Sequence, residues 1–65
     1  MVVYIVEHGD YESSTVIGVY KKHETALKQV HYRISNKSTD EFEDKGNDFW
    51  CNVLEFYKIT EHGVL

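Results

Sequence analysis

The sequence predicts a small α+β domain, in which a three-stranded antiparallel sheet carries one helix on one face. Two runs of β-branched and aromatic residues stand near the N-terminus and a third stands near the C-terminus. Between them lies one segment whose apolar residues recur at helical spacing. With 65 residues, the chain is expected to form a single domain spanning 1–65, because it is too short to bury two separate cores.

The first two strands are predicted at residues 2–8 and 15–20. Both segments are rich in Val, Ile and Tyr, the residue types that favour a pleated strand. Gly9 and Asp10 follow the first run and supply turn geometry, and residues 11–14 form a polar link. The two strands are therefore expected to pair as an antiparallel hairpin.

The helix is predicted at residues 22–35. Its apolar stripe has the spacing of one helix face and consists of Leu27, Val30, His31 and Ile34. Glu24 in the first turn and Arg33 in the last turn both complement the helix dipole.

An acidic loop is predicted at residues 36–48, followed by the third strand at residues 49–60. The loop segment is polar, lacks any periodicity and contains Gly46, whereas the strand segment is rich in aromatic and β-branched residues. With a right-handed crossover, the third strand lies beside the first and antiparallel to it, so the ββαβ chain has the spatial order 2-1-3.

The charge of the chain argues against a nucleic-acid partner. Seven Lys and Arg residues against eleven Asp and Glu residues give a net charge of -4, whereas nucleic-acid affinity depends on basic side chains that displace counterions. We interpret the charge as favouring solubility, with mimicry of DNA as the less favoured alternative.

The cellular location is expected to be the cytoplasm. Cys51 is the only cysteine, so an intrachain disulfide is excluded and a reducing compartment fits best. The apolar run at the N-terminus is short and is followed by Glu7, which matches neither a signal peptide nor a membrane span.

Both faces of the predicted sheet are apolar, and one helix can cover only one of them. A large apolar patch in water is unusual for a monomer, so we expect a homodimer. The alternative is that the acidic loop folds over the second face. The expected dimer interface consists of Tyr4, Val6, Trp50, Val53, Tyr57 and Ile59.

Nothing in the sequence assembles an enzyme site, a metal site or a cofactor site. The four histidines lack the spacing of known zinc ligands, and the acidic loop does not match an EF-hand. Cys51 is predicted in the middle of a strand, which is typical of a packed thiol. We therefore expect a binding protein with neither catalytic residues nor a cofactor.

Two loops are candidates for contact with a partner protein. Tyr11 is an aromatic residue among polar neighbours, and Phe42 stands alone among carboxylates, so each has the character of an interface anchor. The predicted partner-binding residues are Asp10, Tyr11, Glu12, Asp40, Glu41, Phe42, Glu43 and Asp44.

The chain resembles a class of short, mostly uncharacterised ββαβ proteins of phages and bacterial mobile elements. The resemblance covers roughly the first half of the chain and the last strand. It is carried by Gly9, Tyr11, Val19, Tyr20, Glu24 and Ala26. Some small phage proteins of this kind are accessory factors that inhibit a bacterial defence protein by binding it, often as dimers.

This resemblance implies a phage accessory protein that blocks a host defence protein by direct protein contact. The alternatives are a structural, regulatory or antitoxin-like phage protein, and a protein that sequesters a nucleotide signal. The last alternative requires a set of basic residues to converge, namely Lys21, Lys22, Lys28 and Arg33.

Overall fold

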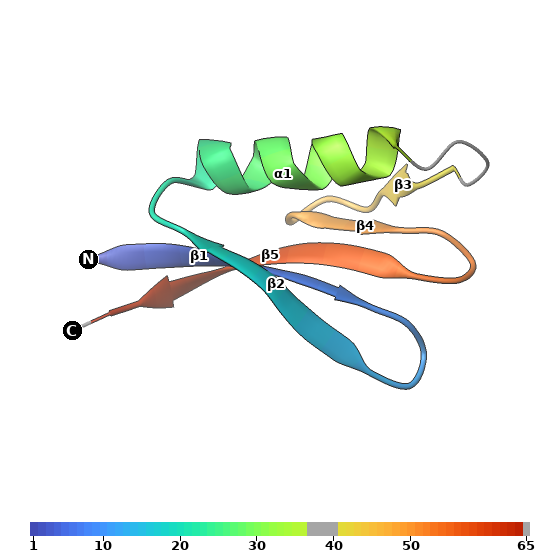
Figure 1. The fold of residues 1–65 in the computed structure, drawn as a ribbon, viewed down its shortest axis with the longest axis horizontal. Coiled ribbons are helices and arrows are strands. Elements are labelled where there is room, and N and C mark those ends of the chain that lie inside the picture. The colour runs from blue at the N-terminus through green and yellow to red at the C-terminus, as the bar shows by residue number, and fades with distance from the viewer. Residues whose placement is uncertain (37–40, 65) are drawn as a thin grey trace.

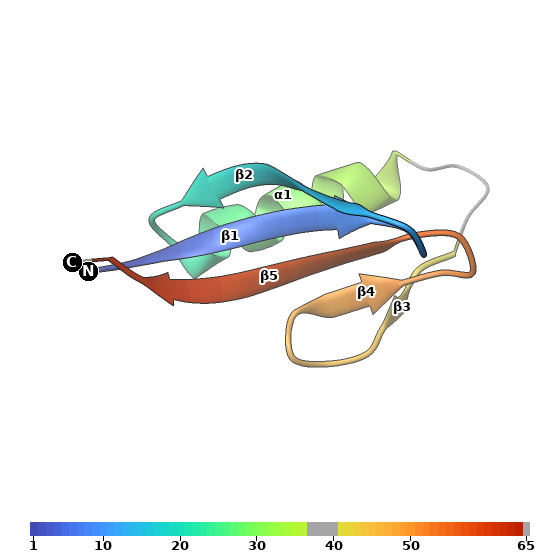
Figure 2. The same ribbon diagram turned by 90° about the horizontal axis from the view of Figure 1, so that it is seen from below.

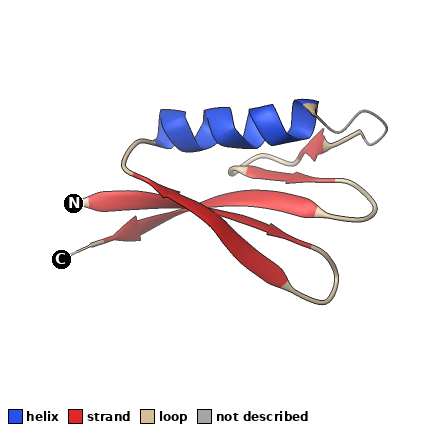
Figure 3. Ribbon diagram, viewed as in Figure 1, coloured by secondary structure: helices blue, strands red, loops and turns tan. Residues whose placement is uncertain are grey.

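The computed structural model describes residues 1–36 and 41–64, which form one antiparallel sheet with a helix across one face (Figures 1 and 3). The sheet has five strands in the order β2-β1-β5-β4-β3. The elements in chain order are β1 (Val2–Gly9), β2 (Ser14–Tyr20), α1 (His23–Ser35), β3 (Glu43–Asp44), β4 (Phe49–Cys51) and β5 (Phe56–Gly63).

The α+β class agrees with the sequence, but the predicted three-stranded sheet is wrong. The segment 49–60, expected as one strand, is divided into β4 and β5 by a turn at residues 52–55. The Asn52 side-chain oxygen accepts the N–H groups of Leu54 and Glu55, both at 2.8 Å, and so closes this turn. The segment expected as an acidic loop contributes the short edge strand β3.

The central strands of the sheet are β1 and β5, which pair over their full lengths. Their register runs from Val2 opposite Gly63 to Gly9 opposite Phe56. On its other side β1 pairs with β2, where a β-bulge makes Ile17 the extra residue of the ladder. Figure 2 shows β1 between β2 and β5, with the β4 hairpin on the far side of β5.

The helix starts after Lys22, whose side chain makes no capping hydrogen bond. Its stability comes from packing rather than from the cap, because Ala26 and Val30 are fully buried against the sheet. The core between α1 and the sheet consists of Val6, Ala26, Val30, Trp50, Tyr57 and Ile59.

The opposite face of the sheet carries no helix, and no described segment of the chain crosses it (Figures 1 and 2). We call it the open face. Cross-strand partners share a face, so the register defines it as Val3, Ile5, Glu7, Gly9, Ser14, Val16, Val19, Glu43, Phe49, Cys51, Phe56, Lys58, Thr60 and His62. Among the described residues there is no helix with the length and apolarity needed to cross a membrane.

Candidate partner-binding surface

The turn between β1 and β2 is held in shape by Asp10. One carboxylate oxygen of Asp10 accepts the N–H groups of Glu12 and Ser13, at 2.9 and 3.1 Å. The backbone N–H of Asp10 donates to the Ser13 carbonyl at 2.9 Å. Gly9 is required beside this turn, because a Cβ there would lie 2.6 Å from the Ser13 carbonyl oxygen. The turn leaves the Tyr11 side chain 89% exposed.

The turn between β4 and β5 lies at the same end of the sheet, because Gly9 of β1 is paired with Phe56 of β5. In addition to its side-chain bonds, Asn52 donates its backbone N–H to the Glu55 carbonyl at 2.9 Å. The two residues at the tip, Val53 and Leu54, are 78% and 60% exposed. Two rigid turns therefore project from one end of the molecule.

Two polar contacts connect these turns. The Tyr11 hydroxyl donates to the Val53 carbonyl at 3.0 Å. The His8 ring and the Glu55 carboxylate approach to 2.9 Å, while the His8 ring stacks on Tyr57 with 4.5 Å between ring centroids. We call the exposed apolar group formed by Tyr11, Val53 and Leu54 the turn-end surface.

Of the shallow cavities that flank the turn-end surface, two are lined by Tyr11. The first, of about 320 Å³, has apolar walls formed mainly by Tyr11, Phe49, Leu54 and Phe56. The second, of about 340 Å³, lies between Tyr11 and the segment that enters β3. Its lining residues are Tyr11, Glu41, Glu43, Lys45, Cys51, Asn52 and Val53. The β1–β2 turn and the acidic segment, distant in sequence, thus meet at one site.

Carboxylates surround this end of the molecule. Hydrogen bonds from the backbone N–H groups of Glu12 and Ser13 hold the pKa of Asp10 below its usual value. The Lys45 ammonium group binds the Glu43 carboxylate, which lowers the pKa of Glu43 and raises that of Lys45. Asp10 and Glu43 are therefore ionised at neutral pH. Lys45 balances the charge of Glu43, whereas Asp10 leaves a negative charge at the rim of the surface.

The predicted partner-binding residues are only partly gathered at this surface. Tyr11 is its most exposed member, and Glu41 and Glu43 line a cavity with it. Phe42 does not project into solvent, because its ring packs on Tyr57 with 5.6 Å between centroids. Asp44 lies in β3, where its carboxylate accepts the Gly46 N–H at 2.9 Å. The predicted residue Asp40 lies outside the described residues.

Sequence reasoning did not assign Leu54 to a partner site, and it assigned Val53 to the dimer interface. Both residues were expected inside a continuous strand, whereas they form the tip of a turn. The signal that could have revealed the turn is Asn52, because Asn side chains commonly bond to backbone N–H groups two and three residues further along.

The residues predicted for a dimer interface mostly lie in the core of the chain itself. Val6, Trp50, Tyr57 and Ile59 are buried against α1, and Tyr4 packs beside them. The helix covers the face that these residues share, so a dimer formed through the other face would use different side chains.

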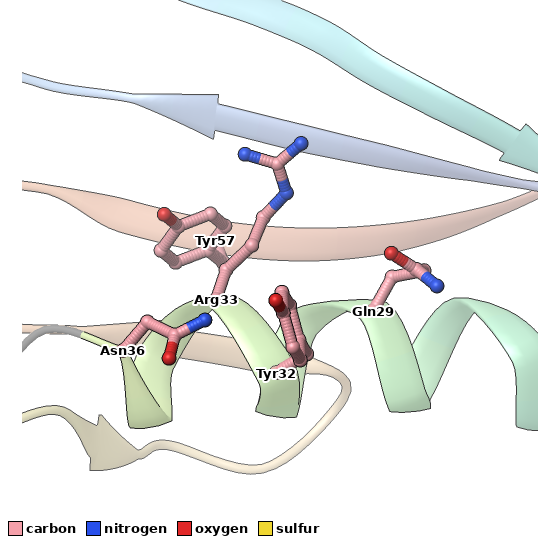
Figure 4. Close-up of a pocket in the computed structure, with 5 residues that line it drawn as sticks. All are labelled: Gln29, Tyr32, Arg33, Asn36 and Tyr57. Carbon is pink, nitrogen blue, oxygen red and sulfur yellow. The ribbon is translucent and has the colours of Figure 1, made fainter.

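Elsewhere, a shallow cavity of about 370 Å³ lies beside the last turns of α1, lined by Gln29, Tyr32, Arg33 and Asn36 of the helix and by Tyr57 of β5 (Figure 4). Of the four basic residues expected to converge on a nucleotide, only Arg33 lines this cavity. Lys28 instead lies 3.6 Å from Glu24 on the helix surface. The described part of the chain holds no group of three or more His, Cys, Asp or Glu residues suited to a metal ion.

Comparisons with known proteins add no assignment: no family model, no curated protein and no solved structure matches this chain. The functional argument therefore depends on the surface chemistry of the chain itself.

Proposed function

We propose that this chain is a non-enzymatic protein that binds another protein through the turn-end surface. The observation that carries the proposal is the exposure of Tyr11, Val53 and Leu54 together at one end of the sheet. Tyrosine is favoured at the centres of protein interfaces, because it buries a large area with few rotatable bonds. Exposed apolar residues clustered within a polar rim are typical of an interaction site.

The surface is also well ordered before any partner arrives. Side-chain to backbone hydrogen bonds close both turns, and the bond from Tyr11 to Val53 joins them. A rigid binding surface loses little conformational entropy on association, so more of the contact energy appears as affinity.

The carboxylate rim defines the charge of the partner. Asp10, Glu12 and Glu41 are exposed around the apolar centre, and the chain as a whole carries a charge of -4. Complementary charges at a rim accelerate association and weaken with added salt. The partner surface is therefore expected to be an apolar recess bordered by Lys or Arg side chains.

Within this proposal, the partner is a bacterial defence protein and the chain is a phage accessory protein that inhibits it in the host cytoplasm. The support for this narrower assignment is the resemblance carried by Gly9, Tyr11 and the helix residues Glu24 and Ala26. A homodimer is part of the proposal, because two copies of the turn-end surface would bind a symmetric target with higher avidity.

The test is site-specific photo-crosslinking with matched positions. A benzophenone amino acid replaces Tyr11 in one variant and Tyr32 in the other, since Tyr32 is an exposed aromatic residue on the helix. Both variants are expressed in bacteria that carry defence systems. Position 11 is expected to crosslink to one host protein and position 32 is not. Crosslinking of that protein from position 32 alone would refute the proposed site.

The crosslinked protein then provides a quantitative test by calorimetry. Tyr11→Ala is expected to weaken its binding at least about tenfold, as for an aromatic interface anchor. Tyr11→Phe retains the ring but loses the bond to Val53, so a smaller loss is expected. Tyr32→Ala is expected to bind as the wild type does. Restored plating of a restricted phage by the wild-type chain, and not by Tyr11→Ala, would test inhibition itself.

A further inference from the structure

We propose that the open face binds a second copy of this chain, face to face about a two-fold axis, with Glu7 of each copy opposite Lys58 of the other. The inference rests on the homodimer included in the proposed function and identifies its interface. It concerns a face that does not include Tyr11, Val53 or Leu54, although its residues Phe49 and Phe56 also line the cavity beside the turn-end surface.

The first argument is the apolar character of the open face. In an antiparallel sheet with one face in water, the residues that point to the water are normally polar. Here β2 presents Val16 and Val19 on this face, at 53% and 57% exposure, beyond the polar Ser14 at its start. On the other side of the face, the rings of Phe49 and Phe56 stack with 5.6 Å between centroids. Together with Ile5, these side chains extend across four strands.

The second argument is charge. At the β3 edge of the open face, Glu43 is paired with Cys51, and Lys45 balances its charge. Along the other four strands, the described Asp, Glu, Lys or Arg residues of this face are Glu7 and Lys58, whose charged groups lie 3.8 Å apart. Their charges cancel, so the net charge of -4 is carried by the rest of the chain. Two copies repel each other least through this face. A strongly basic or acidic partner would find no excess charge there to attract it.

The third argument is the position of this ion pair. In the register, Glu7 lies beside Val16 of β2, and Lys58 lies beside Phe49 of β4. The pair is therefore bordered by apolar side chains at both ends of its row. A two-fold axis that lies between the two faces, parallel to the strands and midway between β1 and β5, brings each Glu7 opposite the partner's Lys58 and makes the interface complementary to itself.

The size of the face indicates a weak, reversible dimer. Strands of eight residues extend about 27 Å, and four strands span about 14 Å, which gives a projected area of roughly 400 Å² per copy. A standard stable interface buries about 800 Å² per partner. The dimer is therefore expected to dissociate in the micromolar range.

Sedimentation equilibrium on the purified chain provides the first measurement. A mass near twice 7.6 kDa at high micromolar concentration, falling toward one chain at low micromolar concentration, is the expected result. A single-chain mass up to millimolar concentration would overturn the homodimer and this interface together. It would leave binding at the turn-end surface unaffected, because that surface is complete in one chain.

Charge exchange identifies the face. Glu7→Lys alone and Lys58→Glu alone each place like charges across the proposed axis, so each is expected to weaken self-association at least tenfold. An equal mixture of the two variants restores opposite charges between chains, and we expect a heterodimer of near wild-type affinity. Isotope labelling of one variant allows native mass spectrometry to distinguish the heterodimer from either homodimer.

A second pair of variants controls for unspecific effects of charge. Val19→Glu lies on the open face and is expected to abolish the dimer, whereas Val53→Glu lies at the other surface and is expected to retain it. Circular dichroism confirms that each variant is folded. If the dimer persists in Glu7→Lys and Val19→Glu, the open face is not the interface.

Discussion

At the scale of single residues, the turn-end surface depends on two side chains that are not themselves apolar. Asp10 and Asn52 each accept backbone N–H groups within their own turns. These bonds fix the backbone of both turns. The fixed backbone directs Tyr11, Val53 and Leu54 into solvent. The apolar surface is thus positioned by polar residues next to it in sequence.

The pH dependence of the first turn follows from the pKa of Asp10. This pKa is lowered chiefly by the N–H of Glu12 and then by that of Ser13. Because the folded pKa is below the unfolded value of about 3.9, the carboxylate stabilises the fold above pH 4, and this contribution is lost as pH falls through the folded pKa. NMR titration is expected to place the Asp10 carboxyl pKa below that of an ordinary aspartate.

Two substitutions separate the charge of Asp10 from its geometry. Asp10→Asn keeps the accepting oxygen, so the turn is retained and the stability lost between pH 4 and pH 2 is reduced. Asp10→Ala removes the acceptor, so urea unfolding is expected to show lower stability at pH 7. Equal urea midpoints for Asp10→Ala and wild type at pH 7 would contradict this role.

Only some residues of the partner-binding surface could be predicted from the residue types in the sequence. Tyr11 could be predicted as exposed, because it lies between the polar residues Asp10 and Glu12 in a turn segment without apolar neighbours. Phe42 presents the same local pattern, yet it packs on Tyr57. The difference arises from the short strand β3, which brings Phe42 over the core and which a polar composition gives no reason to expect.

At the scale of elements, the turn at residues 52–55 changes which side chains share a face. Trp50 and Tyr57 are seven positions apart, and an odd separation places two residues on opposite faces of a continuous strand. The turn instead pairs Trp50 directly with Tyr57, and both point into the core. The predicted single strand therefore gave the wrong distribution of residues between the two faces.

The turn between β3 and β4 has an unusual backbone. Gly46, Asn47 and Asp48 all have positive φ angles, of 80°, 57° and 59°. Gly, Asn and Asp are the residue types that tolerate this left-handed conformation best. Their sequence Gly-Asn-Asp next to the aromatic run is a local signal for a turn, although its partner strand β3 is too short to be recognised from composition.

Two glycine substitutions test this turn against a matched control. At Gly46 and at Gly63, a Cβ would meet nothing within 4 Å, but only Gly46 has a positive φ. Gly46→Ala is therefore expected to destabilise the fold by about 1 kcal/mol through backbone strain alone. Gly63→Ala is expected to leave stability unchanged or slightly higher. Urea midpoints provide the comparison, and equal midpoints would show that the turn does not require the left-handed conformation.

At the scale of the whole molecule, a single described helix of 13 residues packs on a sheet of five strands. It covers one face and leaves the other to solvent or to a second chain. The α+β class and the pairing of β1 with its two neighbours followed from the order of strand and helix segments. The extra hairpin did not, because the separation of β4 from β5 depends on the local bonding of Asn52.

This division of surfaces leads to a prediction about thermal stability. If two chains unfold from a folded dimer, each tenfold rise in protein concentration stabilises the dimer by about 1.4 kcal/mol. An unfolding entropy of about 2.1 cal/mol/K per residue, summed over two chains, converts this to a rise in Tm of about 5 °C. Differential scanning calorimetry from 20 μM to 2 mM measures it. The Tm of Val19→Glu is expected to stay the same throughout this range. If the Tm of the wild type also stays the same, the folded chain gains no stability from self-association.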